Sequence, residues 1–203
     1  MRSSRIFTIF FIALILLSIK NEKAFGACPD GYSSTSKTIT ICNCPMQVDI
    51  CYKCYGVSME YIVNIVGFGF VDDNCIPSQG CNIVQKVYEA IVNPEYLNEE
   101  LCPNNIPPCT TGTVQVKVKY FSCWYKYWDS YQGHVMWEAC EDKAYCEVVY
   151  EYCWDPILEI WQVNVKSHTG NNWPPTCTLN IPPDPDENDP PTDCFNGAYS
   201  PCE

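Results

Sequence analysis

The stretch that decides the expected fold is T-I-T-I-C-N-C-P-M-Q-V-D-I-C-Y-K-C-Y, residues 38–55. Apolar and polar residues alternate in it on both sides of a break at residues 43–46, as at Ile39 and Ile41 before the break. A period of two is typical of β-strands. Because Pro45 cannot donate a backbone hydrogen bond, a turn or a sheet edge belongs at the break. We therefore predict a β-hairpin with thiols on both faces, at Cys42, Cys44, Cys51 and Cys54.

The sequence upstream of this hairpin is typical of a cleaved signal peptide. Arg2 and Arg5 precede an uncharged run over residues 6–19, which is too short to span a bilayer comfortably. Small residues at Ala24 and Gly26 suit cleavage after Gly26, so residues 1–26 are the expected leader. An uncleaved membrane anchor and lipid attachment at Cys28 are the alternatives. The leader predicts a secreted protein that resides in the extracellular space, on the cell surface or in the periplasm.

Cysteine content fits this export route. The chain has 16 cysteines, all of them after the leader, and an even, dense set in an exported chain predicts up to eight disulfides. The spacing does not fix how they pair. The disulfide candidates are Cys28, Cys42, Cys44, Cys51, Cys54, Cys75, Cys81, Cys102, Cys109, Cys123, Cys140, Cys146, Cys153, Cys177, Cys194 and Cys202.

The charge balance disfavours two classes of partner. The formal net charge is −12, and no arginine follows the leader. Phosphate backbones and anionic lipid surfaces would repel such a chain, so we expect neither nucleic acid nor, once the leader is removed, a membrane among the partners. Protein, either a further copy or another surface component, and glycan remain as expected partners.

Further along, the pattern predicts more strands and one helix. Residues 61–71, 113–128, 145–154 and 158–165 read as strands, the last two as a hairpin. Asn82 can cap a helix over residues 83–92 whose apolar positions have helical spacing, and Pro94 can start a further turn or two. The expected fold is mainly β (α+β): antiparallel, sandwich-like sheets cross-linked by disulfides, with one short helix packed on them.

A change of composition after Asn180 predicts a separate tail. Prolines and acids dominate residues 181–193, which therefore cannot bury a core, and an extended acidic linker is expected. Asn196 and Gly197 form a ready turn between Cys194 and Cys202, so we expect these two cysteines to close a small loop. The predicted domains are thus a disulfide-rich β domain over residues 27–180 and a tail over residues 181–203.

No motif in the sequence indicates catalysis, a cofactor or a metal. The pairs Cys42/Cys44 and Cys51/Cys54 could supply four thiolates to zinc, but in an oxidising compartment disulfides are favoured. The two histidines, His134 and His168, lie in polar segments near glycines and belong to no nucleophile or zinc-protease motif. We expect no catalytic, cofactor-binding or metal-binding residue.

Aromatic residues crowd residues 121–137, and not all of their rings can point inward from strands. We therefore predict a secreted, disulfide-stabilised, non-enzymatic protein that acts by extracellular binding or assembly, as a surface or matrix component. One alternative is a carbohydrate-binding module that uses these rings, and another is a small secreted hydrolase with a carboxylate pair. The candidate ligand contacts are Trp124, Tyr125, Tyr127, Trp128, Tyr131 and Trp137.

Overall fold

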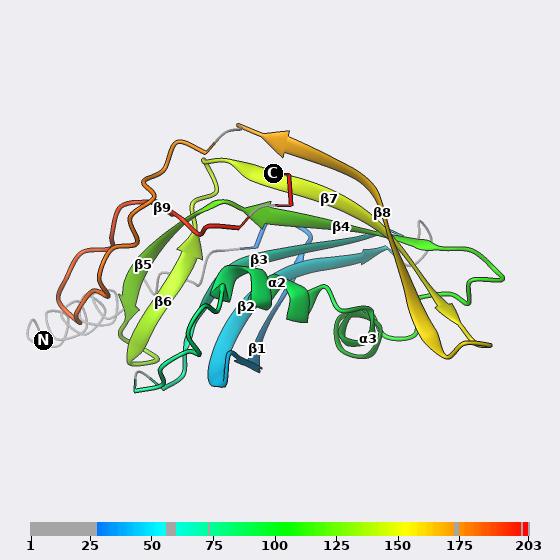
Figure 1. Ribbon diagram of the computed structural model, residues 1–203, viewed down its shortest axis with the longest axis horizontal. Helices are drawn as coiled ribbons and strands as arrows, with labels where there is room; N and C mark the ends of the chain where they lie inside the picture. Colours follow the sequence, from blue (N-terminus) through cyan, green and yellow to red (C-terminus); the bar gives the residue numbers. More distant parts are fainter. Residues whose placement is uncertain (1–27, 56–59, 73, 173–174, 200, 203) are drawn as a thin grey trace, which may run out of the picture.

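The computed structural model describes residues 28–55, 60–72, 74–172, 175–199 and 201–202, so the expected leader lies outside the described residues. Within them the chain forms one hydrogen-bonded sheet of nine strands, with a short helix against it, which confirms the mainly β prediction (Figure 1). The strands are β1 (Ser33–Ile41), β2 (Cys44–Tyr55), β3 (Glu60–Phe70), β4 (Val114–Phe121), β5 (Cys123–Asp129), β6 (His134–Ala139), β7 (Tyr145–Asp155), β8 (Ile160–Asn171) and β9 (Phe195–Asn196). The helical elements are α2 (Ile83–Ile91), α3 (Pro94–Tyr96) and the π-helical turn η1 (Leu97–Leu101).

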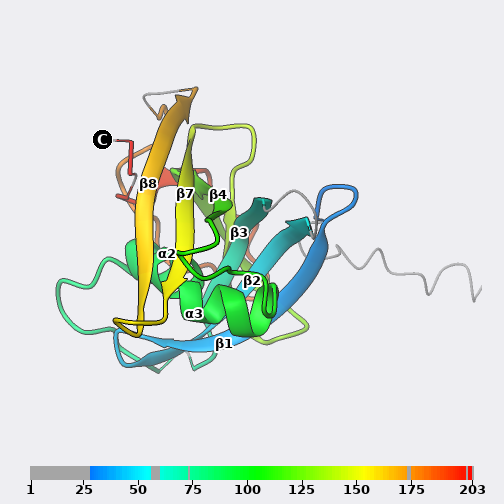
Figure 2. The same ribbon diagram turned by 90° about the vertical axis from the view of Figure 1, so that its right-hand side faces the viewer.

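The sheet branches at β3. One edge of β3 pairs with β2, and β1 continues the sheet beyond β2. The other edge is shared, because Glu60–Asn64 pair with β4 and Gly67–Gly69 pair with β6. One branch continues through β4 to β7 and β8, and the other through β6 to β5 and β9 (Figures 1 and 2). The β3–β4 pair is parallel and all the others between these strands are antiparallel, so the sheet is mixed.

The predicted hairpin is present as β1 and β2, joined by a two-residue turn at Cys42 and Asn43. Both residues have positive φ, 54° and 72°, which is the conformation of the tight turns whose twist matches antiparallel strands. The turn therefore lies at the start of the expected break, and Pro45 lies inside β2 near its start, where its carbonyl accepts a hydrogen bond from Val71 N at 3.1 Å.

Helix α2 closes the core over the apolar face of the sheet. The side chain of Asn82 accepts a hydrogen bond from Gln85 N at 3.1 Å, which confirms the predicted N-cap. The hydroxyl of Tyr88 donates to Lys119 O and accepts from Phe121 N, so this buried phenol is fully satisfied. The helix buries Val84, Val87, Tyr88 and Ile91, and each such side chain contributes about 1.5–3 kcal/mol of hydrophobic stabilisation.

The strand expected over residues 113–128 is broken at Ser122. Here the chain leaves β4, which pairs with β7, and enters β5, which pairs with β6. The backbone of Ser122 donates to Ala144 O and accepts from Gly197 N, so two other segments hold the break in place. The sequence gives no turn residue at this point, because the break is made by the branching of the sheet.

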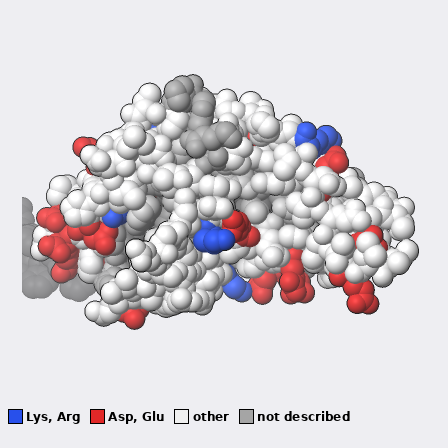
Figure 3. Space-filling view, in the orientation of Figure 1, with Lys and Arg blue, Asp and Glu red and all other residues white. Residues whose placement is uncertain are grey.

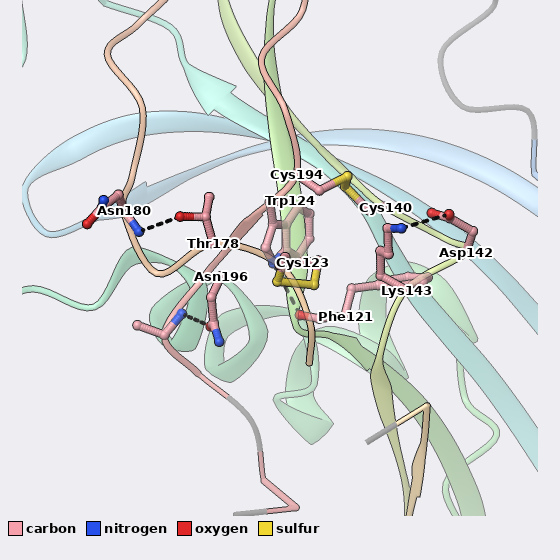
Figure 4. The surroundings of a disulfide bond; sticks show 12 residues. Phe121, Cys123, Trp124, Cys140, Asp142, Lys143, Thr178, Asn180, Cys194 and Asn196 are labelled. Atoms are coloured by element: carbon pink, nitrogen blue, oxygen red, sulfur yellow. Dashed lines mark hydrogen bonds and ion pairs between the residues drawn. A yellow bond between two sulfur atoms is a disulfide. The ribbon is translucent and has the colours of Figure 1, made fainter. Parts of the chain in front are cut away.

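The terminal segment is part of the fold, and the predicted Cys194–Cys202 loop is wrong. Cys194 pairs with Cys140 and Cys202 pairs with Cys146. Phe195 in β9 is fully buried, pairs with Trp124 of β5, and its ring meets that of Trp137 edge-on at 5.0 Å. Figure 4 shows this region, with the Cys123 and Cys140 disulfides beside Trp124. The sheet thus needs residues from the tail to complete its β5 edge.

The acidic linker is anchored by one buried lysine. Lys126 is 5% exposed, and its Nζ donates to Pro182 O at 2.8 Å and to Asp184 Oδ1 at 2.6 Å. Its ammonium also lies 5.0 Å from the ring centre of Trp137, a cation–π distance. Because a buried ammonium needs partners, Lys126 fixes a segment whose prolines and acids alone would leave it extended in solvent.

All sixteen cysteines are paired. The four thiols considered for zinc join four different bridges, which leaves no thiolate for a metal. The pairs are Cys28–Cys51, Cys42–Cys81, Cys44–Cys75, Cys54–Cys102, Cys109–Cys153, Cys123–Cys177, Cys140–Cys194 and Cys146–Cys202.

This pairing predicts the outcome of a disulfide map. Alkylation of the folded protein without reductant should label no cysteine, and a digest without reduction should give separate fragments that link Cys140 to Cys194 and Cys146 to Cys202. Mass spectrometry of the digest checks both. A fragment joining Cys194 directly to Cys202, or a labelled thiol, would contradict this arrangement.

Candidate binding surfaces

The aromatic residues singled out in the sequence do not form one row on the surface. Trp124 is fully buried and Trp137 is 9% exposed, and both rings pack on Phe68 in the core. Tyr125 and Tyr127 lie on the opposite face of β5, half-buried, with ring centres 6.0 Å apart. Trp128 is also half-buried and Tyr131 is 91% exposed in the turn after β5. A ligand role for the accessible rings stays a prediction.

The largest run of exposed apolar residues is on the β7–β8 hairpin instead. The register places Val165 opposite Tyr150, Val163 opposite Tyr152 and Trp161 opposite Trp154, all on the face that carries the core. The core ends at Tyr152, which is buried and whose hydroxyl donates to Val92 O. One strand further out, Val163 is 43% exposed and Val165 is 60% exposed. We call Trp161, Val163 and Val165 the β8 apolar strip.

The other face of β8 is polar. Gln162 and Asn164 point there, and Lys166 forms a 3.0 Å ion pair with Glu151. In the part of the chain that the structure describes, β8 pairs with β7 alone, so its outer edge carries unpaired backbone N–H and C=O groups over a strand of 12 residues. The hairpin therefore combines an apolar face with a free edge.

At one end of this strip lies a pocket of about 330 Å³ that is widely open to solvent, which we call the tryptophan cavity. The rings of Trp154 and Trp161 form one wall, with centres 4.8 Å apart and planes tilted by 57°. Neither tryptophan belongs to the set predicted from the sequence. The lining residues are Asn98, Asn104, Ile106, Pro108, Trp154 and Trp161, none of which carries a charge.

The rest of the lining comes from a loop that is held against β7. Cys109 forms a disulfide with Cys153, and its backbone N–H donates to Trp154 O at 2.8 Å. Trp154 N in turn donates to Pro107 O at 2.9 Å. Within the loop, Asn98 Oδ1 accepts from Ile106 N at 3.1 Å. The covalent bridge and these hydrogen bonds give the cavity its shape before any ligand binds.

A separate group of polar residues lies on the sheet face away from the helix. Asp49 is 6% exposed, and burial raises its pKa, opposed by hydrogen bonds from Ser36 and Gln47. Asp129 raises the pKa of Asp49 further and His134 lowers it. The Nε2 atom of His134 is buried and finds no hydrogen-bond partner among the described residues. None of these side chains lines the tryptophan cavity.

The sequence contains a signal for the tryptophan pair that the density of aromatic residues does not show. Trp154 and Trp161 flank the turn of a predicted hairpin, so cross-strand pairing brings them together. The loop that completes the cavity comes from residues 98–108, about 50 positions upstream of these rings. The Cys109–Cys153 bridge and two backbone hydrogen bonds to Trp154 connect the two segments, and the spacing of the cysteines does not reveal this pairing.

In the view of Figure 3 most of the upper surface carries no charge. Acidic side chains gather at the left, over the terminal segment, and along the lower margin.

None of the helices among the described residues is long and apolar enough to span a membrane. Eight disulfides in a mainly β fold are compatible with an exported, extracellular protein. Comparison of the chain with protein-family models, with curated proteins and with solved structures found no match.

Proposed function

We propose that this is an exported, non-enzymatic protein that acts by assembly, and that β8 is the edge on which two copies join. The observation that carries the proposal is the combination of a free 12-residue edge strand with exposed valines on one face. Natural sheets usually protect such edges, because unpaired backbone groups beside apolar side chains accept a strand from another chain.

Charge supports a second copy as the occupant. The chain has a formal net charge of −12, and most of its surface would repel an identical molecule. Strand β8 contains no acid and one lysine, so two copies that meet along β8 bring no carboxylates of that strand together. Self-repulsion between two copies is therefore small along this strand, which also carries exposed apolar side chains.

The opposite edge of the sheet is protected. Strand β1 is rich in serine and threonine, and Lys37, near its middle, forms a 3.0 Å ion pair with Glu100. A lysine in an edge strand is a common device against unwanted pairing. On β8 the corresponding lysine, Lys166, lies at a register shift, which leaves the segment Ile160–Val165 regular and without charge. Pairing of β8 with β8 is isologous, so it closes a dimer about a twofold axis.

Introducing charge into the β8 apolar strip should separate the copies. In the variant Val163→Lys/Val165→Lys, two partly exposed valines per copy become cations that face like charges across the interface. We expect the dimer dissociation constant to rise on the order of a hundredfold. Size-exclusion chromatography with light scattering over a dilution series of the purified protein measures it.

The matched control is Ile76→Lys/Leu179→Lys, which replaces two apolar residues that are 87% and 81% exposed but lie in loops away from β8. This control should associate as the unmodified protein does. A monomer at all concentrations for the unmodified protein, or equal weakening in the control, would count against β8 as the joining edge.

A further inference from the structure

We propose that the cavity formed by Trp154, Trp161 and residues 98–108 is a binding site for a neutral carbohydrate. The site adjoins the β8 apolar strip and shares Trp161 with it, but the inference goes beyond assembly because it concerns a small ligand and not a second copy of the chain. It also moves the expected glycan contacts away from residues 121–137, where two of the six candidate rings are buried.

The shape of the site suits a sugar ring. The cavity, about 330 Å³, is at the small end of the range of ligand pockets, roughly 300–1,000 Å³. Its two indole rings are inclined to each other by 57°, so they present two flat apolar surfaces at an angle. The C–H groups of a pyranose face are weakly polarised and pack well against the electron-rich face of an indole.

The polar groups in the site suit hydroxyls. Asn104 is exposed, its φ is +58°, and its backbone N–H donates to Asn98 O at 3.0 Å, which fixes the main chain that bears its amide. Each side-chain amide has both a donor and an acceptor, as a hydroxyl does. With Asn98 Oδ1 already bonded to Ile106 N, the Asn98 amide N–H₂ and the Asn104 amide are the groups available to a ligand.

The uncharged lining of the site and the negative charge of the chain both disfavour ionic ligands. No residue that lines the cavity is ionisable, and a chain with a net charge of −12 repels anions. A cation would find aromatic faces but no carboxylate in the lining. A proline-rich peptide could also lie against tryptophans, but it offers mainly carbonyl acceptors, so the acceptor oxygen of the Asn104 amide would gain no partner from it.

Titration of the full mature protein with cellotetraose, chitotetraose and xylotetraose tests the site, with tryptophan fluorescence and the indole N–H signals in NMR as readouts. We expect saturable binding of at least one of these neutral oligosaccharides, with perturbation of Trp154 and Trp161. Because no ionisable group lines the cavity, the affinity should not change between low and high salt or across neutral pH.

Trp161→Ala should weaken this binding on the order of tenfold or more, and Asn104→Ala should weaken it by a smaller factor. Asn104→Ala removes a side chain without a hydrogen bond among the described residues, but alanine is strained at a φ of +58°, so circular dichroism of the variant accompanies the titration as a check of its folding. The control Tyr131→Ala removes an aromatic ring that is 91% exposed elsewhere and should bind as the unmodified protein does.

Three results would overturn the proposal: no saturable binding of any of the three oligosaccharides, binding that Trp161→Ala leaves unchanged, or binding of a polyproline peptide alone. The variant Val163→Lys/Val165→Lys separates this proposal from assembly, because it should lose self-association and keep oligosaccharide binding. Loss of both together would show that the cavity is formed by the pairing of copies and would overturn a site made by one chain.

Discussion

Deletion of residues 181–203 should abolish cooperative folding. To avoid stray thiols the truncated chain would also carry Cys140→Ser and Cys146→Ser, the partners of the two deleted cysteines. We expect far-ultraviolet and near-ultraviolet circular dichroism of this chain to show no cooperative thermal transition. A chain whose tail were a solvated appendage would keep its transition.

The size of this effect follows from what the segment contributes. Loss of a native disulfide costs about 2–5 kcal/mol, and two are lost. Loss of a fully buried phenylalanine, Phe195, costs about 3–5 kcal/mol more. Lys126 would also lose Pro182 O and Asp184, which leaves a buried ammonium without these partners. The sum reaches the whole stability of an ordinary domain, about 5–15 kcal/mol.

A control variant distinguishes the contribution of the disulfides to stability from that of the buried side chains. The full-length variant Cys140→Ser/Cys194→Ser keeps Phe195 and the Lys126 contacts and removes one bridge, so it should fold with a lower melting temperature. If the truncated chain instead had a melting temperature within a few degrees of that of the full chain, the tail would be dispensable for folding and its described contacts would not stabilise the protein.

Gly69→Ala should be strongly destabilising for a different reason, the close approach of β6 at the branch of the sheet. A Cβ atom at this position would lie 2.5 Å from Val135 O and would also overlap Met136 Sδ. The carbonyl belongs to the backbone of β6, and Met136 is 1% exposed, so neither can move without disturbing the sheet. We expect a loss of about 2–3 kcal/mol, even though alanine is otherwise preferred over glycine in a strand.

Gly67→Ala is the matched control, because it makes the same change two residues earlier in β3. Its Cβ would meet Trp137 O at 3.2 Å and Asp49 Oδ2 at 3.6 Å, contacts that a small shift can relieve. In urea denaturation, Gly69→Ala should therefore have a much lower free energy of unfolding than Gly67→Ala. Equal stability of the two would mean that β3 and β6 are further apart at Gly69 than described.

The sequence was a good guide where structure is local. The hairpin of β1 and β2, the Asn82 cap, the apolar face of α2 and the β7–β8 hairpin all follow from periodicity and capping within short windows. It failed for the tail, because composition describes how a segment behaves alone. Buried partners far away in the chain, here Lys126 and the cysteines at 140 and 146, decide whether it is anchored.

The candidate surfaces were harder to predict than the fold. Density of aromatic residues pointed to residues 121–137, but the branch at β3 turns Trp124 and Trp137 into the core. The exposed face of β8 has the same alternation as a buried strand. Its exposure follows from the limited length of α2, which covers the sheet only as far as Tyr152. How far a helix extends over a sheet depends on the tertiary structure, and the local pattern of apolar and polar residues does not reveal it.

The most direct test of the assembly account is hydrogen–deuterium exchange of the mature protein over a concentration series. As a free edge, β8 should exchange quickly at the amides of Ile160–Val165 that do not face β7 when the protein is dilute. Our account predicts that these amides become protected as concentration rises, while those of the opposite edge strand, β1, do not change. Exchange of β8 that is independent of concentration, or protection that appears at β1 instead, would contradict it.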